Sequence, residues 1–269
     1  MSLHSLPRRT LLVLACCGLI LGACAAYEAD PPTPEAPPPP PPPELTEEQK
    51  IFARHAEAIG GEDAIRAHTS MTMKGTFEIP AMGMSGDATV YLQAPDKGIV
   101  HVSFPGLGEN VQAYNGEIGW SEDAMQGARL LEGAELSLLK RQVRIYADLE
   151  YDDLYPQQTA VGETEWDGQA AHQVDLVDAD GNESSRYFAV ETGLFIGEES
   201  TITTEMGTME TSITVGDYKE FGGVLLATST TTSIPSFGME FTQTVESVTF
   251  DDDDPSALEP SDAIKALLE

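Results

Sequence analysis

Basic side chains are scarce in this 269-residue chain, which has 14 lysines and arginines against 45 aspartates and glutamates and a formal net charge of −31 at pH 7. Two of the basic residues, Arg8 and Arg9, lie in a segment that we expect to be cleaved off, which leaves 12 − 45 = −33. Nucleic acid and anionic lipid headgroups both repel a surface of that sign. The composition therefore argues against a nucleic-acid-binding protein.

Cysteine is nearly absent as well. The chain has three cysteines, and Cys16 and Cys17 fall inside the segment expected to be removed. The mature chain would keep Cys24 alone, with no second cysteine to pair with and with its own thiol expected to be modified. This excludes a disulfide, a thiolate nucleophile and a cysteine-based metal cluster in the mature protein.

Motifs of enzymes are missing too. The four histidines beyond position 23 are not spaced as in zinc motifs, and the sequence contains neither a nucleophile elbow nor a phosphate-binding glycine loop. The run Asp178 to Asn182 resembles a calcium loop, but its twelfth position is Ala189 instead of a glutamate. A hairpin turn is the better interpretation there, and the acidic run 251–254 is interpreted as a solvated strand exit, with weak calcium binding as the alternative. The sequence predicts a noncatalytic protein with no cofactor and no metal.

The N-terminus carries the strongest signal. Arg8 and Arg9 precede the apolar run Leu11 to Leu21, which is too short to span a bilayer and is typical of a signal peptide. The run ends in Leu21-Gly22-Ala23-Cys24, a pattern that resembles the bacterial lipobox. The sequence thus predicts a lipoprotein signal peptide over 1–23, with acyl chains such as palmitate attached at Cys24. An ordinary secretory signal that happens to contain a cysteine is the alternative.

Proline dominates the next segment. Nearly every residue from Pro31 to Pro43 is proline, and such a run forms an extended spacer of about 3.1 Å per residue, roughly 40 Å in all. Residues 24–45 are predicted to be a disordered, lipid-anchored tether. A ligand for proline-binding domains is the less favoured alternative. Ala25, after the lipidated cysteine, favours the outer membrane, with the protein facing the periplasm.

Residues 46–269 form the predicted domain, and helical signals appear at three places. Thr46 followed by Gln49 fits a capping box, and Gly60-Gly61 ends that helix before a short second one over 62–68. An apolar stripe between Ala134 and Tyr155 predicts one long helix. Ser261 is expected to cap a short C-terminal helix.

Elsewhere apolar and polar residues alternate, as in Ala88, Val90 and Leu92. Strict alternation is typical of strands with one covered and one wet face. Turn signals separate about ten or eleven such runs, and a phase slip between Val245 and Val248 predicts a bulge. The expected fold is mainly β (α+β), a large curved antiparallel sheet with helices against its concave side.

Several short segments resemble the LolA/LolB-like superfamily of outer-membrane lipoprotein-sorting proteins. They are the lipobox, a helix ending in Ile59-Gly60-Gly61, the segment 115–120 (Asn-Gly-Glu-Ile-Gly-Trp), and Tyr187-Phe188 with 192–194 (Thr-Gly-Leu) after a hairpin. The resemblance spans about 47–251. It implies an unclosed β-barrel with a helical lid over an apolar cavity that receives lipid or lipoprotein acyl chains, without a catalytic centre or a metal.

A lipidated chain looks more like the membrane-anchored acceptor of that family than like its soluble carrier. The segment Phe104 to Gly108 is the nearest candidate for the acceptor's insertion loop. As weak candidates for ligand contact we single out Phe104, Leu107, Leu139, Val143 and Tyr146. Seven methionines are candidates for adaptable groove walls or, individually, for ordinary core residues: Met71, Met73, Met82, Met84, Met206, Met209 and Met239.

Two functions are therefore in competition. The first is a membrane-anchored envelope lipoprotein that binds the acyl chains of a lipid or a lipoprotein in an apolar cavity, with lipoprotein sorting as one role of this kind. The second is a noncatalytic envelope interaction or scaffold protein whose sheet has no ligand cavity. A hydrolase is a third and less favoured hypothesis, and the oligomeric state is left open.

Overall fold

The computed structural model describes residues 44–204 and 207–269, and 44–269 form one compact unit. The expected signal peptide, Cys24, the proline-rich tether up to Pro43, and Met206 lie outside the described residues. No helix in the described part of the chain is both long and apolar enough to cross a membrane.

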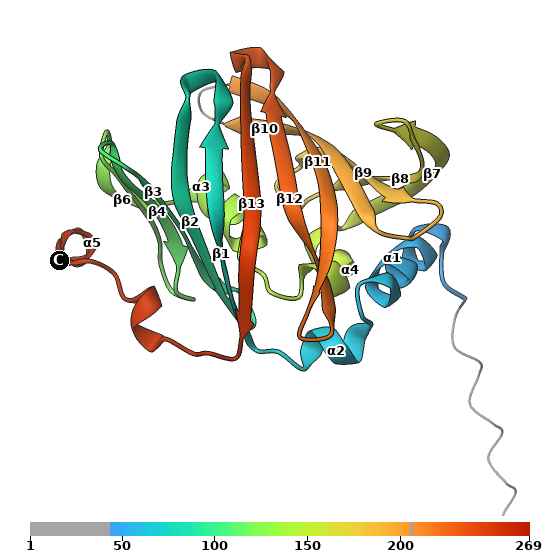
Figure 1. Cartoon of the computed structure of the whole chain (residues 1–269), viewed down its shortest axis with the longest axis horizontal. Coiled ribbons are helices and arrows are strands. Elements are labelled where there is room, and N and C mark those ends of the chain that lie inside the picture. The colour runs from blue at the N-terminus through green and yellow to red at the C-terminus, as the bar shows by residue number, and fades with distance from the viewer. Residues whose placement is uncertain (1–43, 205–206) are drawn as a thin grey trace, which may run out of the picture. The chain divides into compact units, whose positions relative to one another are not determined.

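One antiparallel sheet of thirteen strands dominates the domain (Figure 1). Its order is β6-β5-β4-β3-β2-β1-β13-β12-β11-β10-β9-β8-β7, so the sheet has two edges and does not close into a barrel. The strands are β1 Ser70–Ile79, β2 Met84–Gln93, β3 Lys97–Phe104, β4 Gly108–Tyr114, β5 Gly119–Asp123, β6 Gly127–Leu131, β7 Gln157–Trp166, β8 Gln169–Val177, β9 Glu183–Ala189, β10 Phe195–Thr204, β11 Gly207–Phe221, β12 Val224–Ile234 and β13 Met239–Phe250.

The predicted mainly β architecture with an unclosed curved sheet is confirmed, but the strand number is not ten or eleven. The difference arises where alternation is weak. Strands β5 and β6 have only five residues each, and most of β7 is exposed, so it has no apolar face to detect.

The long helix predicted between Ala134 and Tyr155 is wrong as a single element. The segment forms α3 Gly133–Gln142, the 3-10 turn η2 Ala147–Leu149 and α4 Tyr151–Leu154. Tyr146 leaves helical geometry and donates its hydroxyl to the carbonyl of His68, 2.9 Å away. The apolar stripe is present, but it follows a curved sheet, which a straight helix of that length could not follow.

This interrupted segment connects the two edge strands β6 and β7 and crosses the concave face of the sheet (Figure 1). We call it the lid. Leu139 of α3 and Val143, directly after this helix, pack with Met71, Val90 and Leu92 of the first strands. Tyr151, Leu154 and Tyr155 pack with Phe52 of α1 and with residues of β8 and β9. The core therefore has two halves, one at each end of the lid.

Helices α1 Glu47–Ala58 and α2 Glu62–Arg66 precede the sheet. The predicted capping box is confirmed, because Thr46 Oγ1 accepts from the Gln49 amide and Gln49 Oε1 accepts from the Thr46 amide. Gly60 ends α1 with φ of 128°, and a Cβ there would collide with the carbonyl of Gly223 in the β11–β12 turn. The Gly60 position therefore needs glycine both for its backbone angle and for this close approach.

Two further predictions are confirmed in the sheet and at the C-terminus. Gly75 of β1 pairs with Val245 while Lys74 pairs with Ser247, which leaves a bulge in β13 where the phase slip predicted one. Helix α5 Asp262–Ala266 is capped by Ser261, whose hydroxyl accepts from the amide of Ile264. The fully buried side chain of Ile264 packs with Trp120, on the opposite side of the sheet from the lid.

Candidate functional site

A cleft of about 580 Å³ lies between the lid and the inner face of strands β9 to β12. Its volume is within the range typical of small-molecule sites. The apolar part of its lining comes from α1, the lid, and β10 to β12: Ile59, Leu138, Ala147, Leu154, Phe195, Ile213, Val215, Leu225, Leu226 and Ala227.

A bulge in β11 widens the apolar wall. Gly216 pairs with Ser229 and Tyr218 pairs with Ala227, so Asp217 is left without a partner and has a positive φ of 54°. The extra residue shifts the alternation, and both Val215 and Tyr218 line the cleft although they are three residues apart. Thr228 donates its hydroxyl to the carbonyl of Asp217 and so holds the bulge in place.

Hydroxyl groups occupy the part of the cleft nearest the β12–β13 turn. Ser184, Ser200, Thr211, Thr230 and Thr232 line it there, on the same face as the apolar residues. Ser200 and Thr211 are hydrogen-bonded to each other across β10 and β11 at 2.6 Å. The lining is therefore mixed, with hydroxyl groups gathered near the β12–β13 turn, instead of apolar throughout as the family resemblance implied.

A guanidinium group forms part of the floor of the cleft. Arg186 of β9 donates from Nε to Glu198 at 2.6 Å and reaches the hydroxyls of Tyr151 and Tyr155 at 3.3 and 3.0 Å. Burial opposes the charge on Arg186, but the Glu198 carboxylate beside it keeps the pKa of the guanidinium well above its ordinary value. Burial raises the pKa of the Tyr155 hydroxyl. Arg186 therefore stays a cation, and Glu198 neutralises it locally.

A second arginine ties the lid to the sheet. Arg141 of α3 forms ion pairs with Asp178 at 2.8 Å and with Asp180 at 3.1 Å. Asp178 also accepts hydrogen bonds from the amides of Asp180 and Asn182, so this segment is the predicted hairpin turn between β8 and β9. In the described part of the chain, no three histidine, cysteine, aspartate or glutamate side chains are grouped so as to hold a metal ion.

The α1 end of the cleft contains a histidine–carboxylate pair. Buried His55 donates from Nδ1 to the carbonyl of Gly193 at 3.1 Å and turns Nε2 toward Asp148, 3.6 Å away. Burial would raise the pKa of Asp148, but the interactions with His55, Arg186 and Tyr151 together outweigh it and lower that pKa. Arg54, next to His55, donates to the carbonyls of Val190 and Glu191. Helix α1 thus holds the 190–194 turn, which contains one of the segments that carried the family resemblance, 192–194.

None of the five predicted contact residues is among the described residues that line this cleft. Leu139 and Val143 are buried between α3 and the sheet, and Tyr146 packs near Ile59 and Val224. Phe104 lies at the end of β3, 6.2 Å from the ring of Phe77, and Leu107 is exposed in the following turn. Sequence reasoning missed Arg186 and Tyr218 because neither lies in a recognisable motif, and only the fold brings them to the cleft.

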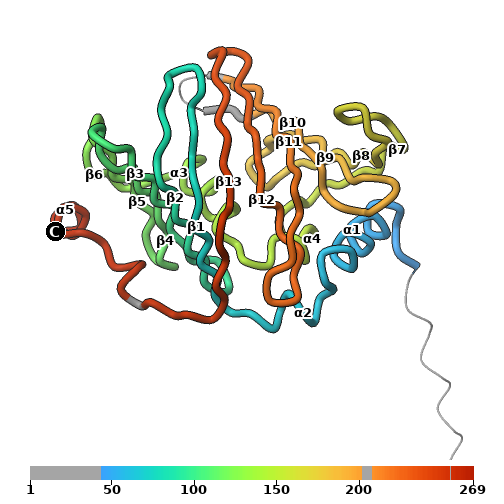
Figure 2. The backbone as a smooth tube through the Cα atoms, viewed as in Figure 1, coloured from blue at the N-terminus to red at the C-terminus, as the bar shows by residue number. Residues whose placement is uncertain are grey.

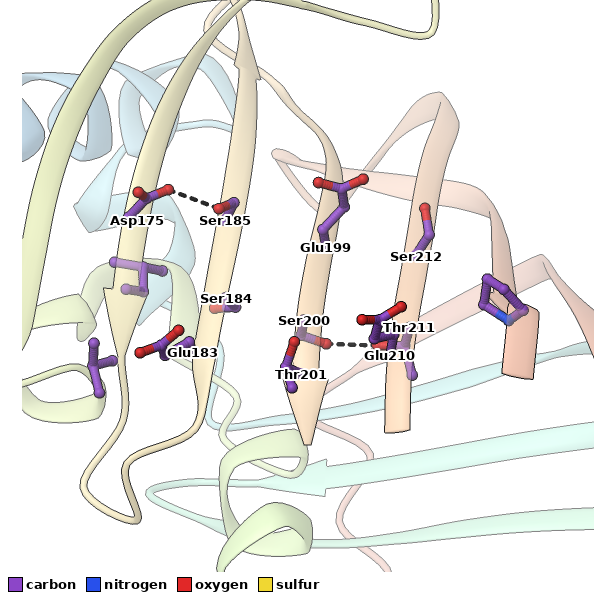
Figure 3. Close-up of a pocket in the computed structure, with 13 residues that line it drawn as sticks. Asp175, Glu183, Ser184, Ser185, Glu199, Ser200, Thr201, Glu210, Thr211 and Ser212 are labelled. Carbon is purple, nitrogen blue, oxygen red and sulfur yellow. Dashed lines mark hydrogen bonds between the residues drawn. The ribbon is translucent and has the colours of Figure 1, made fainter. Parts of the chain in front are cut away.

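A larger depression of about 650 Å³ lies beside the cleft over β8 to β11 (Figure 3). Its lining is mostly hydroxyl and carboxylate groups, and only Leu176, Val177 and Pro235 are apolar. Figure 3 shows Asp175 hydrogen-bonded to Ser185 on this surface, at 2.7 Å. An acyl chain would gain little there, so the smaller cleft is the candidate site.

Comparison with known proteins identifies the fold. No protein-family model matches the chain, and no curated protein does. The chain is similar to the crystal structure of a DUF1329 family protein from Desulfovibrio piger, with a TM-score of 0.56, 12% identity, and coverage of 78% of this chain and 98% of that one. It is similar to a LolA superfamily protein from Nitrosomonas europaea, with a TM-score of 0.54, 11% identity, and coverage of 79% and 97%. The predicted LolA/LolB-like fold is confirmed.

Proposed function

We propose that this protein is an envelope lipoprotein that binds the acyl chains of a lipid or of a lipoprotein in the cleft between the lid and β9–β12. The observation that carries the proposal is the cleft itself, in which one wall is formed by aliphatic side chains such as Ile213, Val215 and Leu225. Each methylene group transferred there from water would contribute about 0.8 kcal/mol. A chain of ordinary length therefore needs no specific polar contact to be bound.

The polar end suits the head of an amphiphile. Arg186 is already neutralised by Glu198, and Arg141 by Asp178, so neither charge is left to select an ionic partner. The neighbouring hydroxyls of Ser184, Thr230 and Thr232 both donate and accept hydrogen bonds. A group that forms hydrogen bonds with hydroxyls, such as an ester, an amide or the carboxyl of a fatty acid, is the head that this end of the cleft would accept. The cleft favours ligand binding over a scaffold without a cavity.

The binding test uses the folded unit Glu44–Glu269, purified without detergent. Native mass spectrometry should detect a bound lipid, and a fluorescent fatty acid should be taken up from solution. Val215→Trp fills the cleft and should weaken uptake by about tenfold or more, whereas Lys219→Trp, an exposed residue on the same strand, should leave uptake unchanged. A ligand-free wild type without uptake would exclude the proposal.

The anchor is a separate part of the proposal. Cys24 would carry the acyl chains and the tether 24–45 would connect them to the domain, with the outer membrane, facing the periplasm, as the location. Two or more acyl chains are needed for stable anchoring. Radiolabelled palmitate should enter the wild-type protein in bacteria but not Cys24→Ser, which should also lose its membrane fractionation. If Cys24→Ser were processed and fractionated like the wild type, the lipid anchor would be contradicted. The uptake assay tests ligand binding in the cleft separately.

A further inference from the structure

Two hairpin turns at one end of the sheet share a sequence pattern and a backbone geometry. The segment 79–84, Ile-Pro-Ala-Met-Gly-Met, joins β1 to β2, and 234–239, Ile-Pro-Ser-Phe-Gly-Met, joins β12 to β13. Each forms a single 3-10 turn that ends at a glycine of positive φ, 62° at Gly83 and 59° at Gly238. Because β1 pairs with β13, the two turns are neighbours (Figure 2).

Both turns hold a large apolar side chain in solvent at the same position. Met82 is 62% exposed and Phe237 is 66% exposed, each directly before the glycine. A single exposed apolar residue is ordinary on a protein surface. The same exposure at equivalent positions of two adjacent turns is more informative, because neither side chain stabilises the fold while it lies in solvent.

The next hairpins continue the row. Leu107, between β3 and β4, is 59% exposed, and Met125, between β5 and β6, is 97% exposed. In an antiparallel sheet of this order, alternate turns lie at the same end, so the four turns follow one rim. We call these four residues the rim tips. The other large apolar residues that are exposed in the described part of the chain lie outside these turns: Leu45, Val161, Leu267 and Leu268.

Carboxylates accompany the rim tips. Each tip has an acidic residue within four positions of it in the sequence, whereas the same windows contain one basic residue, Arg129, which is paired with Glu135. The acidic residues are Glu78, Glu109, Asp123 and Glu240. The rim therefore combines protruding apolar groups with negative charge just behind them.

We propose that the rim tips insert into the surface of a lipid bilayer that carries no net negative charge. A fluid bilayer accepts separate protruding apolar side chains one at a time, whereas a protein partner would need four pockets at matching positions. The carboxylates behind the tips would be repelled by anionic headgroups but tolerated by zwitterionic ones. Peripheral proteins that bind through basic residues have the opposite preference.

The position of the cleft fits this orientation. Thr230 and Thr232 line the cleft and lead directly into the turn that contains Phe237. Docking of the rim would bring the polar end of the cleft toward the lipid. If residues 24–45 form the proposed tether, an extended proline run of roughly 40 Å would be about as long as the twelve-residue strand β13, and a domain anchored through it would reach the same bilayer with this rim. These two points rest on the proposed function, but the arrangement of the rim tips does not.

The test uses Glu44–Glu269, which lacks the anchor, in cosedimentation with phosphatidylcholine vesicles and with phosphatidylglycerol vesicles. Replacing all four rim tips by serine should lower partitioning into phosphatidylcholine by about tenfold or more. The matched control replaces exposed apolar residues away from the rim, and it should partition like the wild type: Val161→Ser, Leu267→Ser and Leu268→Ser. Binding to phosphatidylglycerol should be weaker and should increase with salt, because salt screens the repulsion.

Three outcomes would overturn the proposal. They are a wild type that does not sediment with either vesicle, a control variant that loses as much binding as the rim variant, and stronger binding to phosphatidylglycerol that salt weakens. A lipid-free dimer that the rim variant abolishes would instead assign the rim to a second copy of the chain. Uptake of fatty acid from solution should persist in the rim variant, which separates a failure of the rim from a failure of the cleft.

Discussion

His68 and Asp251 join the beginning of the sheet to its last strand, with Nδ1 of the imidazole 2.8 Å from the carboxylate. Nε2 of the same ring lies 3.0 Å from the carbonyl of Gly222, and the ring stacks on Phe250 at 3.9 Å. A carboxylate and a carbonyl can only accept, so the doubly protonated imidazolium satisfies both contacts. Asp251 also accepts from the amide of Thr69. The pair closes the junction where β1 meets β13.

Stability should therefore fall as the pH rises above neutrality. The hydrogen bond to Asp251 raises the pKa of His68, so its contribution is complete below about 6.5 and is lost as pH rises through the raised value. The hydrogen bond from His68 lowers the pKa of Asp251, so that contribution is lost only in acid. The free energy of unfolding measured with urea should drop between pH 6 and pH 9 by about 1 kcal/mol or less, since the pair is partly exposed. If His68→Gln lost as much unfolding free energy between pH 6 and pH 9 as the wild type, the assignment of this pH dependence to His68 would be contradicted.

The largely buried ion pair between Arg186 and Glu198 predicts a strongly non-additive result. Glu198→Leu leaves the Arg186 guanidinium without its counter-charge and should cost about 3–5 kcal/mol. Arg186→Met combined with Glu198→Leu removes both charges and should cost less than either single change. Denaturant unfolding of the four proteins completes a double-mutant cycle. Additive single and double effects would show that the two side chains do not interact.

Two adjacent leucines of α3 should behave differently. Leu139 is fully buried against the sheet, and Leu139→Ala should cost about 2–5 kcal/mol. Leu138 lines the cleft and is partly exposed, so Leu138→Ala should cost less stability and change fatty-acid uptake instead. Unfolding by urea and uptake of a fluorescent fatty acid measure the two effects. A larger loss of stability in Leu138→Ala than in Leu139→Ala would contradict this orientation of α3.

Glycine at the β13 bulge should be irreplaceable. A Cβ on Gly75 would collide with the backbone carbonyl of Thr244 on the paired strand, so Gly75→Ala must separate β1 from β13. We expect a loss of about 1–3 kcal/mol. Gly216→Ala is the matched control, because it lies on β11 with open space at the Cβ position. Equal midpoints for the two variants in urea unfolding would contradict the close approach at Gly75.

Local patterns in the sequence were sufficient for elements that depend on neighbouring residues. Thr46 and Gln49 predicted the start of α1, Ser261 predicted α5, and the apolar phase slip near Val245 predicted the bulge. Each of these signals lies within a few residues, where capping hydrogen bonds and alternation operate. The resemblance carried by short segments gave the correct fold.

The cleft and the rim were decided only by tertiary structure. Arg186 meets Tyr151 from the lid, and Val215 and Tyr218 share a wall because Asp217 bulges. Such contacts join residues far apart in the chain, and no local pattern encodes them. The stripe from Leu136 to Leu149 was real, but its packing on a curved sheet divided one expected helix into three elements. The sequence alone determined which face of each strand and helix is apolar. The packing of the lid against the curved sheet determined where space remains for a ligand.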